Sequence, residues 1–115
     1  MSVFRYEDTV GAGATVENIM AGSKFEFLQR PSAVRIFAAQ DAGDLAQLDF
    51  TLGNVIIGEN LALPKRVAGE GPSMSDDKLV AGVGMPSDRI QIRLRETGGA
   101  QPAITRVMVE ISELA

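Results

Sequence analysis

The sequence of 115 residues contains no cysteine, no histidine and no tryptophan, and it has a single tyrosine. Without cysteine there is no disulfide and no thiolate nucleophile, and without either cysteine or histidine there is no Cys/His zinc site. The absence of histidine also removes every catalytic scheme that depends on an imidazole base. These absences exclude several large classes of enzyme before any motif is considered.

Excess positive charge and long apolar runs are also missing. The chain has 11 Lys+Arg against 15 Asp+Glu, a net charge of -4 and a pI near 4.7. Nucleic-acid contact is therefore not expected to be its main role, since that affinity comes from clustered Lys and Arg. The N-terminus lacks the pattern of a signal peptide, and no apolar run approaches the roughly 20 residues that span a bilayer. We expect a single domain, residues 1–115, with no membrane span.

The dominant pattern in what remains is an alternation of apolar and polar residues with a period of two. Residues 45–52 alternate in this way, with Leu48 and Phe50 on the apolar side, and residues 89–95 repeat the pattern with Ile90 and Ile92. Further strands are expected at 3–6, 24–28, 33–39, 55–57, 78–83 and 103–112. The sequence thus predicts an all-β protein, a single antiparallel β-sandwich of about eight strands that is jelly-roll-like.

Glycine, proline and changes of parity predict how these strands connect. Residues 97–100 predict a hairpin between the last two strands, and the turns at 40–44 and 53–54 predict a meander of neighbouring strands. Segment 24–28 is expected to pair with 33–39. Ile104 has the opposite parity to the rest of its strand, which predicts a bulge or a change of buried face near Thr105 or Arg106. Residues 1–22 are expected to form an N-terminal strand or arm, and 64–78 a long loop.

No segment carries the full pattern of a catalytic or cofactor site. Three Gly-x-Gly segments lack the rest of a dinucleotide fingerprint, so turn glycines are favoured over a nucleotide site. The pairs Asp41/Asp44 and Asp76/Asp77 could ligate a hard cation such as Ca²⁺, but bonds to turn backbone are the favoured role. Two carboxylates facing each other across a cleft also stay open as an acid–base pair. We assign no catalytic residue, no cofactor and no metal.

The basic residues favour protein partners, because eight of the 11 are arginine, a residue enriched in interfaces. Arg89, Arg93 and Arg95 should project from one face of one strand. That face could meet an acidic neighbour, a phosphate backbone or solvent. Phe4 and Tyr6 are more apolar than a terminus requires, and they either contact another subunit or cap the open end of the sandwich. These five residues are the predicted subunit contacts.

Two segments resemble a known family. Residues 17–36 are similar to the start, and residues 89–99 to the finish, of small β-sandwich shell proteins of tailless bacterial viruses. The resemblance is one of pattern and proportion, without a residue-specific motif, so it transfers no functional residue. It implies a single jelly-roll-like domain without catalysis that assembles into capsomers.

The leading hypothesis is therefore a non-enzymatic virion structural protein: a shell subunit that forms homo-oligomers and contacts other shell proteins, assembled in the host cytoplasm. One alternative is a small-molecule or glycan-binding β-sandwich that uses its long loop and rim as the site. A second is a small hydrolase or isomerase that relies on two carboxylates.

Overall fold

The structure, a computed structural model, describes residues 2–41, 43–66 and 78–114. These residues contain no helix and form nine strands. The strands are β1 (Ser2–Val10), β2 (Thr15–Val16), β3 (Ser32–Asp41), β4 (Ala46–Leu52), β5 (Val55–Ala62), β6 (Lys65–Arg66), β7 (Lys78–Gly84), β8 (Ile90–Glu96) and β9 (Ala103–Glu113). Since no helix is present in this part of the chain, none of a length and apolarity that could cross a membrane occurs there.

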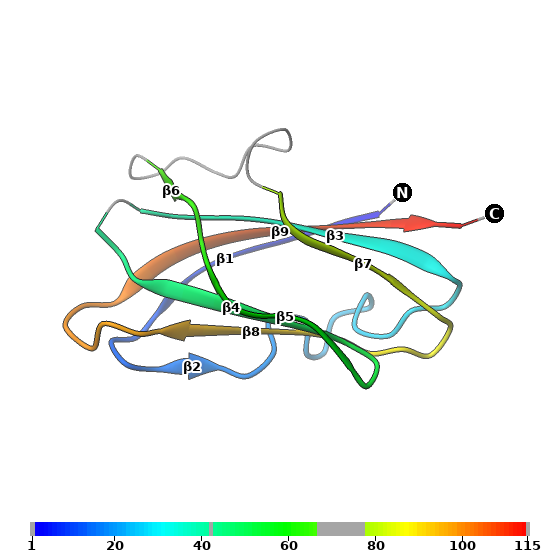
Figure 1. Cartoon of the computed structure of the whole chain (residues 1–115), viewed down its shortest axis with the longest axis horizontal. Coiled ribbons are helices and arrows are strands. Elements are labelled where there is room, and N and C mark those ends of the chain that lie inside the picture. Colours follow the sequence, from blue (N-terminus) through cyan, green and yellow to red (C-terminus); the bar gives the residue numbers. More distant parts are fainter. Residues whose placement is uncertain (1, 42, 67–77, 115) are drawn as a thin grey trace.

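The strands form two layers that pack face to face (Figure 1). In the first layer, sheet A, the order is β1-β9-β3, and both β7 and the short β6 pair with the outer side of β3. In the second layer, sheet B, the order is β2-β8-β4-β5. Every pairing is antiparallel except the two-residue contact of β6 with β3. The chain is therefore a β-sandwich, as its alternating pattern predicts.

The strand pairing defines the kind of sandwich. The first strand pairs with the last, β1 with β9, and then β2 pairs with β8, β3 with β7 and β4 with β5. This nested pairing is what a long antiparallel ribbon produces when it rolls up into two four-stranded sheets, which is a jelly roll. The short β6 is an addition to that scheme. The predicted fold class is confirmed.

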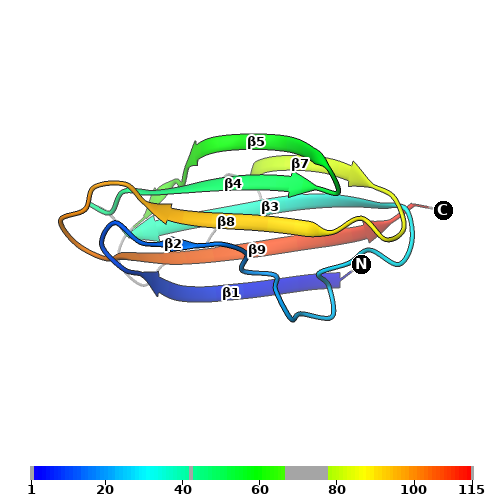
Figure 2. The ribbon, with the colours of Figure 1, turned by 90° about the horizontal axis from the view of Figure 1, so that it is seen from below.

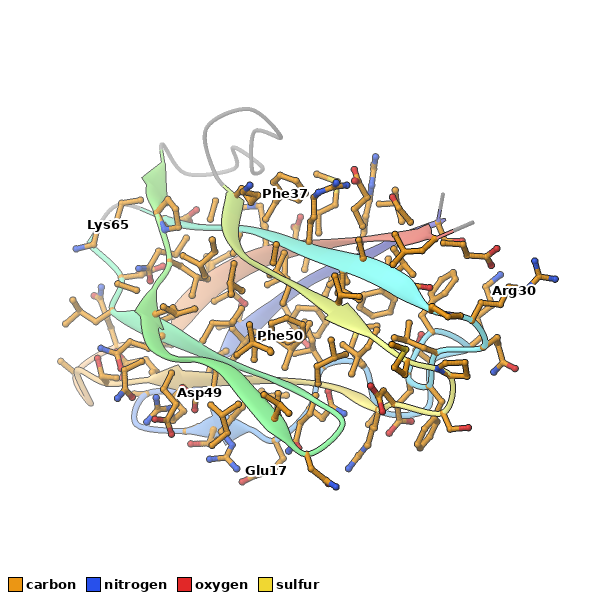
Figure 3. All side chains as sticks on the ribbon, turned by 45° about the vertical axis from the view of Figure 1, so that its right-hand side comes forward. Glu17, Arg30, Phe37, Asp49, Phe50 and Lys65 are labelled. Carbon is orange, nitrogen blue, oxygen red and sulfur yellow. The ribbon has the colours of Figure 1, made fainter. Side chains whose placement is uncertain are left out.

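The core lies between the two sheets, where every second residue of β3, β4, β8 and β9 is buried, apart from Glu113 at the end of β9. Phe50 of β4 is fully buried at the centre, as Figure 3 shows, beside Leu48 from the same strand. Ile92 and Leu94 of β8 and Ile36 of β3 are equally inaccessible. Burying each such side chain contributes about 1.5–3 kcal/mol. Apolar alternation in the sequence thus sets which face of each strand is inside.

Segment 24–28 is not a strand, and this prediction was wrong. Its residues form turns, with one isolated bridge between Phe27 and Arg89, and they do not pair with β3. The expected parity is also reversed, because Glu26 and Leu28 are buried while Phe27 is 49% exposed. Glu26 is buried because its carboxylate binds the Gly22 N–H and the Arg89 guanidinium, and the neighbouring Phe27 is left exposed.

The predicted meander was wrong as well. Residues 97–100 do not close a hairpin, because β8 belongs to sheet B and β9 to sheet A, so this turn crosses from one sheet to the other. Residues 40–44 cross between sheets in the same way, from β3 to β4. The turn at Gly53, with a φ of 62°, does close a hairpin, between β4 and β5. A turn signal marks a reversal of the chain but not which sheet the next strand joins.

The C-terminal strand contains neither the bulge nor the change of buried face predicted near Thr105 or Arg106, since its odd-numbered residues from Ala103 to Ile111 are all buried. The pairing of β9 with β1 and with β3 runs without a register shift past Thr105 and Arg106. Ile104 has the opposite parity simply because it faces outward, where it is 38% exposed.

The predicted arm and loop are now partly defined. Within residues 1–22, β1 is a full member of sheet A and β2 a short strand of sheet B. The expected loop 64–78 begins and ends in strands, at β6 and β7, and its residues 67–77 lie outside the described part of the chain.

Candidate functional site

Arg89, Arg93 and Arg95, the arginine row, lie on the outer face of sheet B. Arg93 and Arg95 alternate along β8 with buried residues such as Ile92 and Leu94, and Arg89 continues the alternation directly before Ile90. Their side chains are 45%, 42% and 29% exposed, respectively. The predicted common face is confirmed, and all three side chains also bind acidic partners within the chain.

Arg89 forms an ion pair with Glu26. The Arg89 Nε lies 2.7 Å from Glu26 Oε2, and the other carboxylate oxygen accepts the N–H of Gly22 at 3.0 Å. The Gly22 N–H and then the Arg89 guanidinium hold the pKa of Glu26 below its ordinary value of 4.5. This pair therefore fastens segment 22–26 to the start of β8.

The other two members of the row bind neighbours on the same face. Arg95 Nη2 lies 2.9 Å from Asp49 Oδ1 on β4 and also donates to Asn60 of β5. Arg93 Nε is 3.3 Å from Glu17, whose side chain is 74% exposed, so this is a solvent-screened pair. Figure 3 shows Asp49 and Glu17 on this side of the molecule. A shallow groove of about 110 Å³ opens beside Arg93.

The outer edge of β8 is covered by residues 14–28, which we call the cover segment. At one end Glu96 N donates to the carbonyl of Ala14, and β2 then pairs with residues 94 and 95. At the other end Ile90 N donates to the carbonyl of Glu26 at 2.7 Å, and Leu28 N donates to Asp88 O at 3.0 Å. Ile19, Met20 and Leu28 of the same segment are buried in the core. The cover segment thus acts as an irregular edge strand of sheet B.

Asn18 supplies the middle of this cover with its side chain. Its Oδ1 accepts the N–H groups of Ile92 and Met20, each at 3.0 Å, and its Nδ2 donates to the carbonyl of Ile90 at 3.3 Å. The amide therefore replaces the main chain of a neighbouring strand where the cover segment turns away from β8.

Glu96 fastens the start of the cover segment. Its carboxylate accepts three backbone N–H groups, from Gly13 at 2.8 Å, Gly98 at 2.9 Å and Gly99 at 2.6 Å. Chiefly the N–H groups of Gly13 and Gly99 hold its pKa below the ordinary value of 4.5. One buried carboxylate thereby joins the turn after β1 to the turn after β8. Sequence reasoning missed Glu96, although a glutamate two residues before Gly98-Gly99 was a visible signal.

The edge of sheet A on the same side of the sandwich is open. β1 pairs with β9 along all nine of its residues, and among the described residues its main chain pairs with no other strand. In Figure 2, β1 is the outermost strand of its sheet. Exposed edge strands are templates for pairing with another chain. The sequence predicted only residues 3–6 of this strand, so its length was not apparent.

Phe4 and Tyr6 lie on this open strand and point into the sandwich. Both are half-buried against the core, and the Phe4 ring meets Phe25 of the cover segment edge-on, with centroids 6.4 Å apart. Burial, and secondarily the charge of Asp8, raises the pKa of the Tyr6 hydroxyl. The structure thus brings these two residues together along one edge, separate from the arginine row, and their role as subunit contacts stays a prediction.

A cavity of about 240 Å³ lies at the end of the sandwich near both termini. It is lined by Phe25, Phe27, Lys24 and Arg30 together with residues of β1, β3 and β9. Its volume is below the roughly 300–1,000 Å³ of typical ligand pockets. It is a candidate for the apolar pocket expected of a ligand-binding module.

The aspartates considered as cation ligands have structural partners. Asp41 binds Arg106 at 2.7 Å, and Asp44 accepts the N–H of Ile104 at 3.0 Å. The described part of the chain holds no cluster of three or more potential metal ligands. Asp76 and Asp77 lie outside the described residues.

Comparisons with protein-family models, with curated proteins and with solved structures give no match to this chain.

Proposed function

We propose that this protein is a non-enzymatic structural subunit of a virion shell, which self-associates and contacts other shell proteins after synthesis in the host cytoplasm. The observation that carries the proposal is a jelly roll with one long open edge. Jelly rolls are a recurrent fold of viral capsid proteins, although lectins and cupins share it, so the fold alone is an argument by analogy. The open edge adds a physical route to assembly that is independent of the analogy.

The arginine row has a secondary part in this proposal. Arg93 is half-exposed, and its ion pair is with an exposed glutamate, so a neighbouring subunit could replace Glu17 at little cost. Arg89 and Arg95 hold more buried partners, Glu26 and Asp49. We therefore expect Arg93 to be the member of the row that is most available to another shell protein.

A small-molecule or glycan-binding module is the second candidate, and the cavity beside Phe25 and Phe27 favours it. Phe27 is 49% exposed there, and Lys24 lies 5.1 Å from the Phe25 ring centre. An aromatic wall next to cationic side chains suits a small apolar ligand that carries a negative charge. The carboxylate-based enzyme has no comparable observation in its favour.

The test of the proposed function is light scattering on the purified chain across protein and salt concentration, followed by negative-stain imaging of any large species. Closed oligomers or particles would support the shell proposal. A monomer at every concentration, together with saturable binding of a small anion that Phe27→Ala abolishes, would replace it with the ligand-binding candidate. Phe27→Ala is a clean probe because the half-exposed ring is not part of the core.

A further inference from the structure

The open edge of sheet A defines a specific partner and a specific register. We propose that β1 pairs antiparallel with β1 of a second copy, with the two-fold axis beside Tyr6, so that the two A sheets become one continuous sheet. This inference rests on the self-association in the proposed function, and it names the surface that performs it. The length of β1, the charges along it and the irregular backbone of the other edge strands all favour this pairing.

Strand length favours Tyr6 as the centre. β1 runs from Ser2 to Val10, and Tyr6 is its middle residue. With the axis at Tyr6, Ser2 of one copy lies opposite Val10 of the other, and every residue of the strand has a partner. Moving the axis by one residue in either direction leaves two residues at each end of the contact unpaired.

Charge selects the same centre. With the axis at Tyr6, Arg5 of each copy lies opposite Glu7 of the other, which gives two attractive cross-strand pairs. An axis at Arg5 would place Arg5 opposite itself, and an axis at Glu7 would place Glu7 opposite itself. Both side chains are exposed, and Glu7 has one long ion pair, 3.6 Å to Arg106, with its own side chain 70% exposed. Length and charge are independent properties of the strand, and they agree.

The faces of the sheet are preserved by this arrangement. Paired residues have the same parity, so outward residues meet outward residues and inward residues meet inward ones. The two copies of Tyr6 lie across the axis on the inner face, and this contact would extend each core. Phe4 would lie opposite Asp8 of the second copy, which adds no favourable contact. We therefore expect a modest dissociation constant, in the micromolar range of about 1–100 μM.

The edges on the other side of the sandwich are poorer templates. The pairing of β5 with β4 has two register irregularities, and Asn60 in β5 has a φ of 55°. β7 has a register shift opposite β3 and contacts β5 through side chains, with Ile57 close to Gly82. Irregular backbone of this kind is how edge strands resist pairing. Among the described strands, β1 is the edge that combines length with a regular backbone.

Charge reversal tests the register directly. In Arg5→Glu and in Glu7→Arg, both cross-strand pairs become repulsive, so each variant should dimerise at least about tenfold more weakly than the wild type by analytical ultracentrifugation. An equimolar mixture of the two variants should form heterodimers of near wild-type affinity. In the heterodimer one copy carries glutamate at both positions and the other carries arginine at both, so each cross-strand pair is again attractive. Thermal melts serve as the folding control, and Arg93→Glu as the matched charge reversal away from β1.

A second experiment uses the absence of cysteine. In Tyr6→Cys the two thiols would lie across the axis with Cα atoms about 4.5–5.5 Å apart, a spacing that a disulfide accommodates. Mild oxidation should crosslink this variant, whereas Val3→Cys, which lies opposite Thr9 of the second copy, should stay uncrosslinked under the same conditions.

The outcomes separate this inference from the proposed function. If both charge-reversal variants form oligomers or particles as readily as the wild type, and mixing them does not strengthen association, the β1 contact is overturned and the shell proposal stands. A dimer that follows the predicted pattern without any larger assembly would support the β1 contact and count against a shell. A wild-type chain that stays monomeric at about 1 mM would overturn both.

Discussion

Two neighbouring edges of this sandwich differ in one respect that matters for assembly. The edge of β8 in sheet B is covered by residues 14–28, which satisfy its main chain with backbone and side-chain partners. The edge of β1 in sheet A has no such cover among the described residues. The same chain thus blocks one edge with an irregular segment and leaves the adjacent one regular and free. The comparison is the basis for the proposal that the open edge pairs with a second copy, whereas the covered edge is a structural element.

The largest expected difference between the two edges is in packing. Met20 of the cover segment is fully buried, whereas Val3 of β1 is 37% exposed. Met20→Ala should lower the free energy of unfolding by about 2–5 kcal/mol, and Val3→Ala by less than about 1 kcal/mol. Urea denaturation of the two variants measures this. Equal losses would show that the cover segment is no better anchored than the open edge.

The next difference is in hydrogen bonding at the edges. Asn18→Ala leaves the Ile92 N–H and the Ile90 carbonyl without their partner, which should cost about 2–3 kcal/mol. Asp8→Ala is the control on β1, because the exposed Asp8 side chain accepts a hydrogen bond from the adjacent Thr9 N–H, which solvent can replace. Its cost should stay below about 0.5 kcal/mol. If Asn18→Ala proved as mild as the control, water would be replacing the side chain and β8 would not be truly covered.

Acid should weaken the cover segment selectively. Glu26, near one end of the segment, binds Arg89, and Glu96 binds Gly13 immediately before the other end; both carboxylates have folded-state pKa values below 4.5. A lowered folded pKa means that the stabilisation is present above the unfolded pKa and is lost as pH falls below 4.5 through the folded value. Glu96→Gln should reduce the free energy of unfolding at pH 7, and its stability should fall less steeply than that of the wild type as the pH is lowered. Glu113→Gln, at an exposed carboxylate 3.6 Å from Arg30, is the control that should leave this pH dependence unchanged.

If the stability of Glu96→Gln fell with decreasing pH as steeply as that of the wild type, the prediction would be contradicted, since other carboxylates would then cause the acid unfolding. Thermal melts between about pH 3 and pH 7 give the comparison.

The smallest expected effect concerns the arginine row. Arg93→Ala removes a screened ion pair with Glu17 and should change the free energy of unfolding by less than about 0.5 kcal/mol. It should also leave the β1 dimer intact, because Arg93 lies on the other sheet. A variant that folded normally but no longer self-associated would move the contact surface from β1 to the outer face of sheet B.

The sequence predicted the parts of this structure that depend on periodicity. Strands with clean alternation, such as β4 and β8, were located to within a residue, and their apolar residues form the core. The arginine row was placed on one face by the same argument. These features follow from local chemistry, because a half-buried strand must alternate wherever it lies in the fold.

What the sequence did not predict depends on distant partners. Segment 24–28 has the alternation of a strand, but Glu26 is buried through its ion pair with Arg89, 63 residues away in the chain. The Glu96 carboxylate likewise binds Gly13, which lies 83 residues away in the chain. A Gly-Gly turn also has the same sequence pattern whether it closes a hairpin or crosses between sheets. The open edge could not be predicted either, because whether a strand is an edge is decided by the strand order and not by its own residues.

The most direct test of the open-edge account is hydrogen exchange, residue by residue, at low and high protein concentration. In the monomer, amides at the β8 edge such as Ile92 should be protected, while outward amides of β1 exchange rapidly. At high concentration the account predicts that β1 amides centred on Tyr6 gain protection and that β8 amides do not change. A gain confined to another surface, or β1 amides that are equally protected at both concentrations, would contradict it.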